Sequence, residues 1–167
     1  MIEAVQDKLV TLNQTHLQAE LDELASPAGG VALTLTAPLE YHIAFEKGFT
    51  IIKKYPACLV LPGMTEEDDL IDNGFTVDNI HDIAMVYLLQ HTDPAYLQRM
   101  KSRFAVAARK VLKKRTDADG VTIDKSPITQ ITDIHMSFMD RNVRDEKDTP
   151  FLGSVWLLFK AHERETL

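Results

Sequence analysis

The stretch Ile83-Ala84-Met85-Val86-Tyr87-Leu88-Leu89 is the feature of this sequence that most restricts the fold. Successive side chains of a β-strand point to opposite faces of the sheet. In a strand, the odd-numbered residues of this run therefore face one side and the even-numbered residues face the other, and all of them are apolar. A run of this length and composition predicts a strand that is buried on both faces. The segment from Gly153 to His162 repeats the pattern over a shorter span.

The other segments predict one domain over residues 1–167, with the element order helix, strand, strand, helix, strand, strand. We expect an N-terminal helix over 1–25, an irregular connection with short strand pieces over 26–54, and a core of sheet and helix over 55–163. Asp93-Pro94 is a strong helix start, because the aspartate can accept hydrogen bonds from the first-turn amides. The predicted fold class is α+β, a mainly antiparallel four-stranded sheet with helices packed on one face. Its strands are expected at 57–61, 75–90, 134–138 and 153–162, and its second helix at 94–115.

Helices on one face of such a sheet leave the second apolar face without a cover. Two interpretations stay open. Either the connection 31–54 or the first helix wraps over that face, or another subunit covers it, since large bare apolar patches are rare on monomers.

Charge is divided unevenly along the chain. The 18 basic and 25 acidic residues give a net charge of −7, which argues against broad nucleic-acid binding. Eight of the basic residues lie between 99 and 115, a window without acids, whereas residues 55–98 hold eight acids and no Lys or Arg. A solvated helix face and a nucleic-acid contact are two interpretations of the basic window. The third is protein assembly, because complementary surfaces at different places on one molecule favour a head-to-tail contact that can close into a ring. The candidate interface residues are Glu66, Glu67, Asp68, Asp69, Arg99, Arg103, Arg109, Lys113 and Lys114.

Motifs for catalysis or for metal binding are not found. The sequence has no Gly-x-Ser-x-Gly elbow, no phosphate-binding glycine loop and no His-Glu-x-x-His pair. The six histidines lack ligand spacing, the acidic run from Glu66 is expected to be solvated, and Cys58 lies in an apolar run where nothing nearby would activate it. We therefore predict a non-enzymatic protein with no catalytic residue, cofactor or metal. The single cysteine and the lack of a signal peptide or membrane span predict synthesis in a cytoplasm.

A series of segments from about residue 40 to 163 forms a recognisable pattern: Tyr41-His42-Ile43, Tyr55 to Pro62, His81 to Tyr87, Asp93 to Leu97, Arg103-Phe104-Ala105 and Ala107 to Leu112, followed by two strands around a charged loop. This pattern resembles the tail-terminator and tail-completion proteins in the neck of tailed bacteriophages. The chain departs from the family pattern in its long, glycine-poor 31–54 connection and in the acidic insertion around Glu66. A head-closure or head–tail adaptor protein of the same neck therefore stays an alternative, as does a nucleic-acid-binding α+β module that uses the basic helix 94–115.

The resemblance implies a structural virion subunit, located in the tail or neck and made in the host cytoplasm. Such proteins form a homo-oligomeric ring, usually sixfold, that caps the tail tube and joins it to the head. The implied partners are other copies of the chain, the tail tube protein, and the head connector or head-closure protein. DNA would pass through the lumen without specific binding, and no membrane is involved. The charged loop from Arg141 to Asp148, with Arg141 and Arg144, is the implied contact with the tube or connector.

Overall fold

The computed structural model describes residues 1–43, 52–68, 76–141 and 149–166. It contains a helix α1 (Ile2–Ala25), strands β1 (Glu40–Ile43), β2 (Ala57–Asp68) and β3 (Thr76–His91), a helix α2 (Pro94–Lys113), and strands β4 (Ile128–Arg141) and β5 (Phe151–Thr166). Both helices begin where the sequence places them. The strands run further than the apolar runs that reveal them, because pairing continues into polar residues at both ends.

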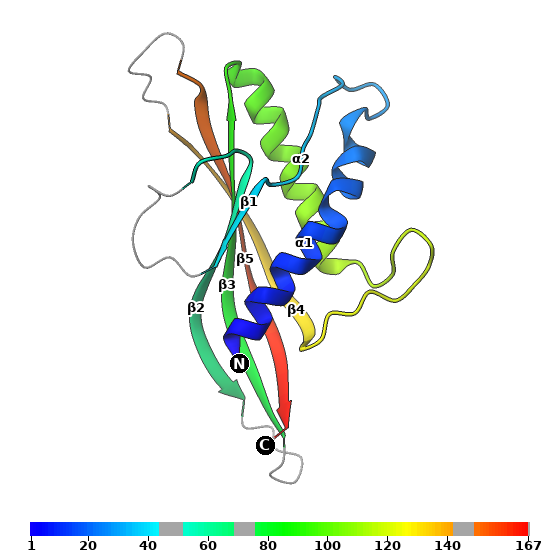
Figure 1. Ribbon diagram of the computed structural model, residues 1–167, viewed down its shortest axis with the longest axis vertical. Coiled ribbons are helices and arrows are strands. Elements are labelled where there is room, and N and C mark those ends of the chain that lie inside the picture. The colour runs from blue at the N-terminus through cyan, green and yellow to red at the C-terminus, as the bar shows by residue number, and fades with distance from the viewer. Residues whose placement is uncertain (44–51, 69–75, 142–148, 167) are drawn as a thin grey trace.

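The strands form one mixed sheet of five, in the order β1-β2-β3-β5-β4 (Figure 1). The prediction of a four-stranded, mainly antiparallel sheet was wrong. Its connection 26–54 contains β1, which pairs in parallel with Ala57–Val60 of β2. The element order accordingly has a strand more than predicted. Short strand pieces were expected in this connection, but four residues carry too little pattern to predict that one of them joins the sheet, and parallel pairing depends on a partner that lies elsewhere in the chain.

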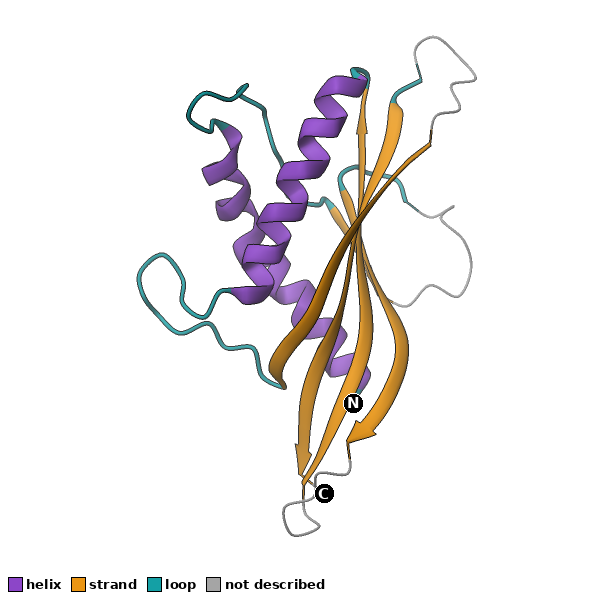
Figure 2. Ribbon diagram, turned by 180° about the vertical axis from the view of Figure 1, so that it is seen from behind, coloured by secondary structure: helices purple, strands orange, loops and turns teal. Residues whose placement is uncertain are grey.

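Both helices pack on the same face of the sheet (Figure 2). Their apolar sides join Met85, Tyr87 and Leu157 in one buried core. The predicted start of α2 is confirmed, because Asp93 Oδ1 accepts a hydrogen bond from the Ala95 amide at 2.8 Å. Asn13 fixes α1 on the sheet by accepting a hydrogen bond of 2.5 Å from the Tyr87 hydroxyl, with both side chains fully buried.

The face away from the helices is apolar in its middle, and there it is buried. Leu59 and Val86 point to that side and have no exposed surface, whereas Leu158 is 44% exposed. The interpretation that the first helix wraps over this face was wrong, because α1 lies on the other side. The unpartnered apolar surface is therefore smaller than the sequence indicates. In the described part of the chain, neither helix is long and apolar enough to cross a membrane.

Candidate assembly surface

Half of the cations in the basic window make contacts within the chain. Lys101 is 2% exposed and pairs with Asp140 of β4. The Arg103 guanidinium donates to the carbonyl oxygens of Ala25, at 2.9 Å, and Val31, at 2.5 Å. These contacts lock α2 against β4 on one side and against the segment that follows α1 on the other. For Lys101 and Arg103, the basic charge serves the fold.

Two further cations join the helices to each other. Lys110 lies 3.0 Å from Glu23 and 3.4 Å from Glu20, and Lys114 also pairs with Glu20, whose side chain is only 3% exposed. The hydrogen bond from Lys110 holds the pKa of Glu23 below its ordinary value, and the hydrogen bond to Glu20 raises the pKa of Lys114. Lys114, a predicted interface residue, is thus already engaged between α1 and α2.

The other four cations of the window face solvent. Arg99, Arg109, Lys113 and Arg115 are exposed, and none has an ion-pair partner among the residues that the structure describes. Arg109 and Lys113 line a hollow of about 590 Å³ between α2 and β4. We call this hollow the basic groove; it is lined by Val106, Arg109, Lys110, Lys113, Lys114 and Met136.

Strand β4, which borders the basic groove, is at the edge of the sheet and pairs only with β5 among the described strands. Its side chains are unusually apolar for an edge. Met136 is 40% exposed, Phe138 48% and Met139 55%. The basic groove and the edge of β4 together form a surface that is cationic and apolar at once, which is the composition of a protein contact rather than of a solvated face.

The predicted acidic residues lie elsewhere. Glu66, Glu67 and Asp68 belong to the end of β2, which pairs there with β3, so this part of the acidic run, which lies between the strands expected at 57–61 and 75–90, is itself a strand. The Glu66 side chain is 58% exposed and its carboxylate lies 3.8 Å from Lys160. Asp69 and Arg144 lie outside the described residues, and Arg141 is the last residue of β4.

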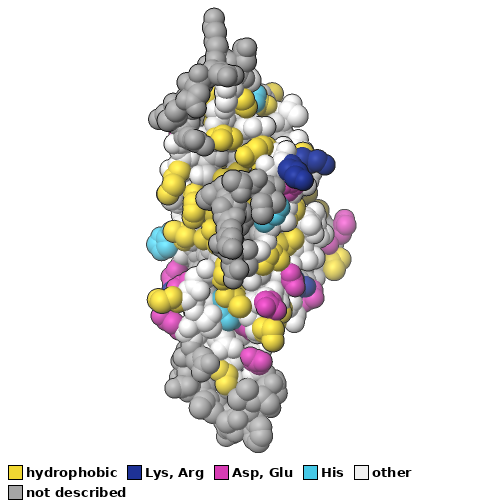
Figure 3. All heavy atoms as spheres, turned by 60° about the vertical axis from the view of Figure 1, so that its left-hand side comes forward, with side chains coloured by type: hydrophobic (Ala, Val, Ile, Leu, Met, Phe, Trp, Pro, Cys, Tyr) yellow, Lys and Arg dark blue, Asp and Glu magenta, His cyan; other side chains and the backbone are white. Residues whose placement is uncertain are grey.

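The candidate residues thus fall on two surfaces rather than one. In the sheet, β3 and β5 separate β2 from β4, so the acidic group lies far across the sheet from the basic groove. Figure 3, which brings the β1 and β2 side forward, shows hydrophobic side chains over the middle of that side, with acidic side chains scattered around them. No contact within the chain joins the two charged surfaces among the described residues.

A polar cluster near the C-terminal ends of β2 and β5 was not predicted from the sequence; its His81 and Glu163 are buried and its Thr65 is exposed. The Thr65 hydroxyl lies 3.0 Å from His81 Nδ1, and His81 Nε2 lies 2.9 Å from Glu163 Oε2. His81 is 2% exposed and Glu163 4%. The order hydroxyl, imidazole, carboxylate is that of a hydrolase triad, and Thr65 is not among the residues that line the basic groove. The cluster ties β2, β3 and β5 together; no sequence spacing could reveal it, because its members come from three strands.

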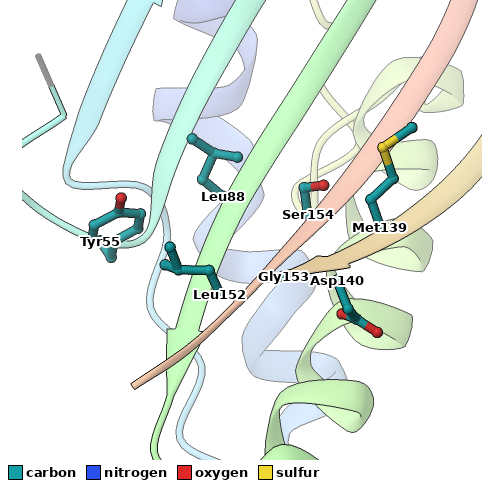
Figure 4. A pocket seen from close by; sticks show the side chains of 7 residues that line it. All are labelled: Tyr55, Leu88, Met139, Asp140, Leu152, Gly153 and Ser154. Carbon is teal, nitrogen blue, oxygen red and sulfur yellow. The ribbon is translucent and has the colours of Figure 1, made fainter. Parts of the chain in front are cut away.

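A smaller hollow of about 380 Å³ opens near the ends of β4 and β5 (Figure 4). Tyr55, Leu88 and Met139 contribute apolar walls, and Asp140 turns away toward α2, where Lys101 neutralises it. The described residues contain no group of three His, Cys, Asp or Glu side chains that could hold a metal ion.

Comparisons with known proteins add little. The chain matches no protein-family model and no curated protein in sequence. One solved structure that is similar is a chain from the "Virion of native gene transfer agent (GTA) particle", with 17% identity, a TM-score of 0.35, and coverage of 75% of this chain and 78% of that chain. A similarity of this degree carries no argument, so the functional case depends on the surfaces described above and on the sequence pattern.

Proposed function

We propose that this chain is a structural subunit of a phage-like virion, and that within the virion it acts as a tail terminator of the neck. In this role, copies of the chain form a ring, with six subunits as the expected number, that caps the tail tube and meets the head connector or head-closure protein. DNA passes through the lumen of the ring without specific binding. The ring assembles after synthesis in the host cytoplasm.

The observation that carries the proposal is the placement of two complementary surfaces on opposite parts of one sheet. The basic groove with the edge of β4 lies on one side, and the exposed Glu66 at the end of β2 lies on the other. Two different surfaces that complement each other make a heterologous contact, and such contacts close into rings when the rotation allows. The resemblance of the sequence pattern to tail terminators supplies the location in the neck.

Nucleic-acid binding by α2 is the weaker alternative. Four of the eight cations of the basic window 99–115 bind carboxylates and carbonyl groups of the chain itself, so they are not available to phosphates. Two of the other four cations, Arg109 and Lys113, line the basic groove together with exposed Val106 and Met136, and a phosphate-binding face gains nothing from these apolar side chains. A head-closure or adaptor role in the same neck would use the same two surfaces.

The test is the mass of the purified protein in solution, by light scattering over a range of concentrations, followed by electron microscopy of the assembled fraction. We expect a discrete oligomer and ring-shaped particles. A gel-shift assay at low salt tests the alternative of nucleic-acid binding, because phosphate binding would retard the DNA and the retardation would fall steeply with salt. A monomer at all concentrations that also retards DNA would contradict the proposal.

A further inference from the structure

We propose that the connection between β2 and β3 of one copy binds in the basic groove of the next copy. The part that binds is Asp69-Leu70-Ile71-Asp72, here called the acidic segment, which lies outside the described residues. The inference rests on the proposed self-assembly and goes beyond it by naming the segment and the groove that meet. The occupant of the groove is a second copy of this chain.

The basic groove has the composition of a binding site for an acidic peptide that also carries apolar side chains. Arg109 and Lys113 line it, face solvent and have no ion-pair partner among the residues that the structure describes. Val106 and Met136 line the same groove and are 44% and 40% exposed. A partner that neutralises the two cations and covers the two apolar side chains is therefore favoured.

The acidic segment carries the complementary side chains, because two aspartates flank two apolar residues. No Lys or Arg lies anywhere in residues 55–98. The other two internal segments outside the described part of the chain, 44–51 and 142–148, each contain Lys or Arg as well as acids. The basic groove repels those cations, so charge selects the acidic segment among the three.

The acidic segment lies too far along the sheet to cover the groove of its own copy. Asp68, the residue before it, lies level with Arg164 of β5, whereas Met136 of the groove pairs with Leu157. Seven positions of β5 separate these two levels, which is about 23 Å at the rise of a strand. Leu70 is two residues beyond Asp68, and extended chain carries it no further than about 7 Å. A segment that covers Met136 therefore comes from another copy.

The contact joins two different surfaces of identical molecules. Strand β2 ends and β3 begins at one end of the sheet (Figure 1), whereas the basic groove lies between α2 and β4. A heterologous contact of this kind repeats from copy to copy and closes into a ring when the rotation allows. The pair between Lys101 and Asp140 already holds α2 on β4, so the two walls of the groove are fixed before binding and little order has to be gained. Because β4 borders the groove, an occupant also lies along the edge of the sheet.

Cysteine cross-linking tests the contact directly. Leu70→Cys and Val106→Cys are prepared as separate proteins, and native Cys58 stays in place because it has no exposed surface. We expect oxidation to give a disulfide dimer when the two variants are mixed, and little when either is oxidised alone. Val121→Cys, at a position 61% exposed in the connection after α2, replaces Val106→Cys as the control and should not cross-link to Leu70→Cys. A dimer of Leu70→Cys or of Val106→Cys with itself would overturn the inference, because identical surfaces would then meet.

The double variant Leu70→Cys/Val106→Cys shows whether the two positions meet between chains or within one chain. After oxidation, we expect non-reducing electrophoresis to give a ladder of covalent oligomers that ends at the number of subunits in the ring. A monomer with an internal disulfide, which migrates faster than the reduced protein, would overturn the inference. The acidic segment would then occupy the groove of its own copy.

Charge exchange gives a second, independent measurement. The variants Asp69→Lys/Asp72→Lys and Arg109→Glu/Lys113→Glu should each weaken self-association by more than about tenfold, because each places like charges in contact. Mixing the two variants should restore association, since each acidic or reversed segment then finds a groove of opposite sign. The control Glu3→Lys/Asp7→Lys, on exposed positions of α1, changes the net charge as much as the first variant and should leave association unchanged.

The outcomes separate this inference from the proposed function. A ring that forms normally in both charge variants, with no cross-link in the mixture, would overturn the contact and leave the ring standing. Retardation of DNA that disappears in Arg109→Glu/Lys113→Glu while association persists would assign the groove to nucleic acid and overturn the inference as well. A wild-type protein that stays monomeric would overturn both proposals. Circular dichroism and the thermal midpoint of each variant verify that it is folded before association is judged.

Discussion

The Lys101 ammonium on α2 pairs with the Asp140 carboxylate on β4, with the lysine side chain almost completely buried. Asp140 also accepts a hydrogen bond of 2.7 Å from Gln98. Through these two contacts, α2 holds the edge strand of the sheet in place. Any partner that binds β4 therefore meets a strand that is already fixed.

We expect Asp140→Ala to lower the free energy of unfolding by about 3 kcal/mol, because it leaves the Lys101 charge buried without a partner. Lys101→Met is the matched control. It removes the buried charge and keeps the apolar stem, so its cost should be smaller, while the partly exposed Asp140 remains hydrated. Denaturant unfolding of both variants measures the difference. Equal losses would contradict the view that the unpaired lysine is the costly group.

Gly153 gives the Lys101 side chain room to pass. A Cβ atom at this position would lie 2.9 Å from Lys101 Cδ and 3.0 Å from Asp140 Oδ1. Gly153→Ala should destabilise the fold by about 1–3 kcal/mol, as overpacking does in a well-packed site. In the double variant Gly153→Ala/Lys101→Ala, the added methyl group gains space, so the two losses should not add. Additive losses in a double-mutant cycle would show that Lys101 is not the obstacle.

The adjacent residues Lys113 and Lys114 should respond differently to charge reversal. Lys114→Glu places a second carboxylate beside the buried Glu20 and should lower the thermal midpoint. Lys113→Glu, on an exposed residue of the basic groove, should leave the midpoint unchanged and reduce self-association. Differential scanning calorimetry and light scattering on the same samples separate the two effects. A lower midpoint in Lys113→Glu would count against its role as a free surface charge.

Acid should weaken the polar cluster near the C-terminal ends of β2 and β5. Burial alone would raise the pKa of Glu163, but hydrogen bonds from the Met1 amino group and from His81 hold it below its ordinary value of 4.5. A carboxyl with a lowered pKa contributes stability above its unfolded pKa and loses that contribution as the pH falls through the folded pKa. The free energy of unfolding should therefore decline below about pH 4.5, and less steeply in Glu163→Gln. If the free energy of unfolding fell equally steeply with pH in the wild type and in Glu163→Gln, Glu163 would be excluded as the source of the acid sensitivity.

Local patterns in the sequence were enough to place the long elements. The helix start at Asp93-Pro94 and the strand around Met85 that is apolar on both faces are each indicated by adjacent residues, and both are found in the structure. Short strand pieces were expected in the connection that contains β1, but its place in the sheet was missed because its partner, the start of β2, is not adjacent to it in the chain. The continuation of β2 through Glu66 was missed because acidic residues favour loops until a neighbouring strand provides the pairing.

The candidate surface was predicted only in part, again because the partners of its residues lie elsewhere in the chain. The sequence shows eight cations in one helix, but only the fold distinguishes Lys114, which binds Glu20, from Lys113, which faces the groove. The partners of Lys101 and His81 are 39 and 82 residues away in the chain. Charge counts along a sequence therefore overestimate the charge that a folded surface presents.

Strand β3 pairs with β5 along its whole length, whereas β4 pairs with described residues on one side only. Hydrogen exchange of these two strands can therefore report what happens at the edge of the sheet. Amide hydrogens of β3 should exchange with deuterium only when the domain unfolds, whereas the outward amides of β4 should exchange through small local openings. If a second copy docks on that edge, the β4 amides will slow toward the rate of β3 as the protein concentration rises. Peptides covering His135–Asp140 would then record, without any label or substitution, the fraction of chains that have joined.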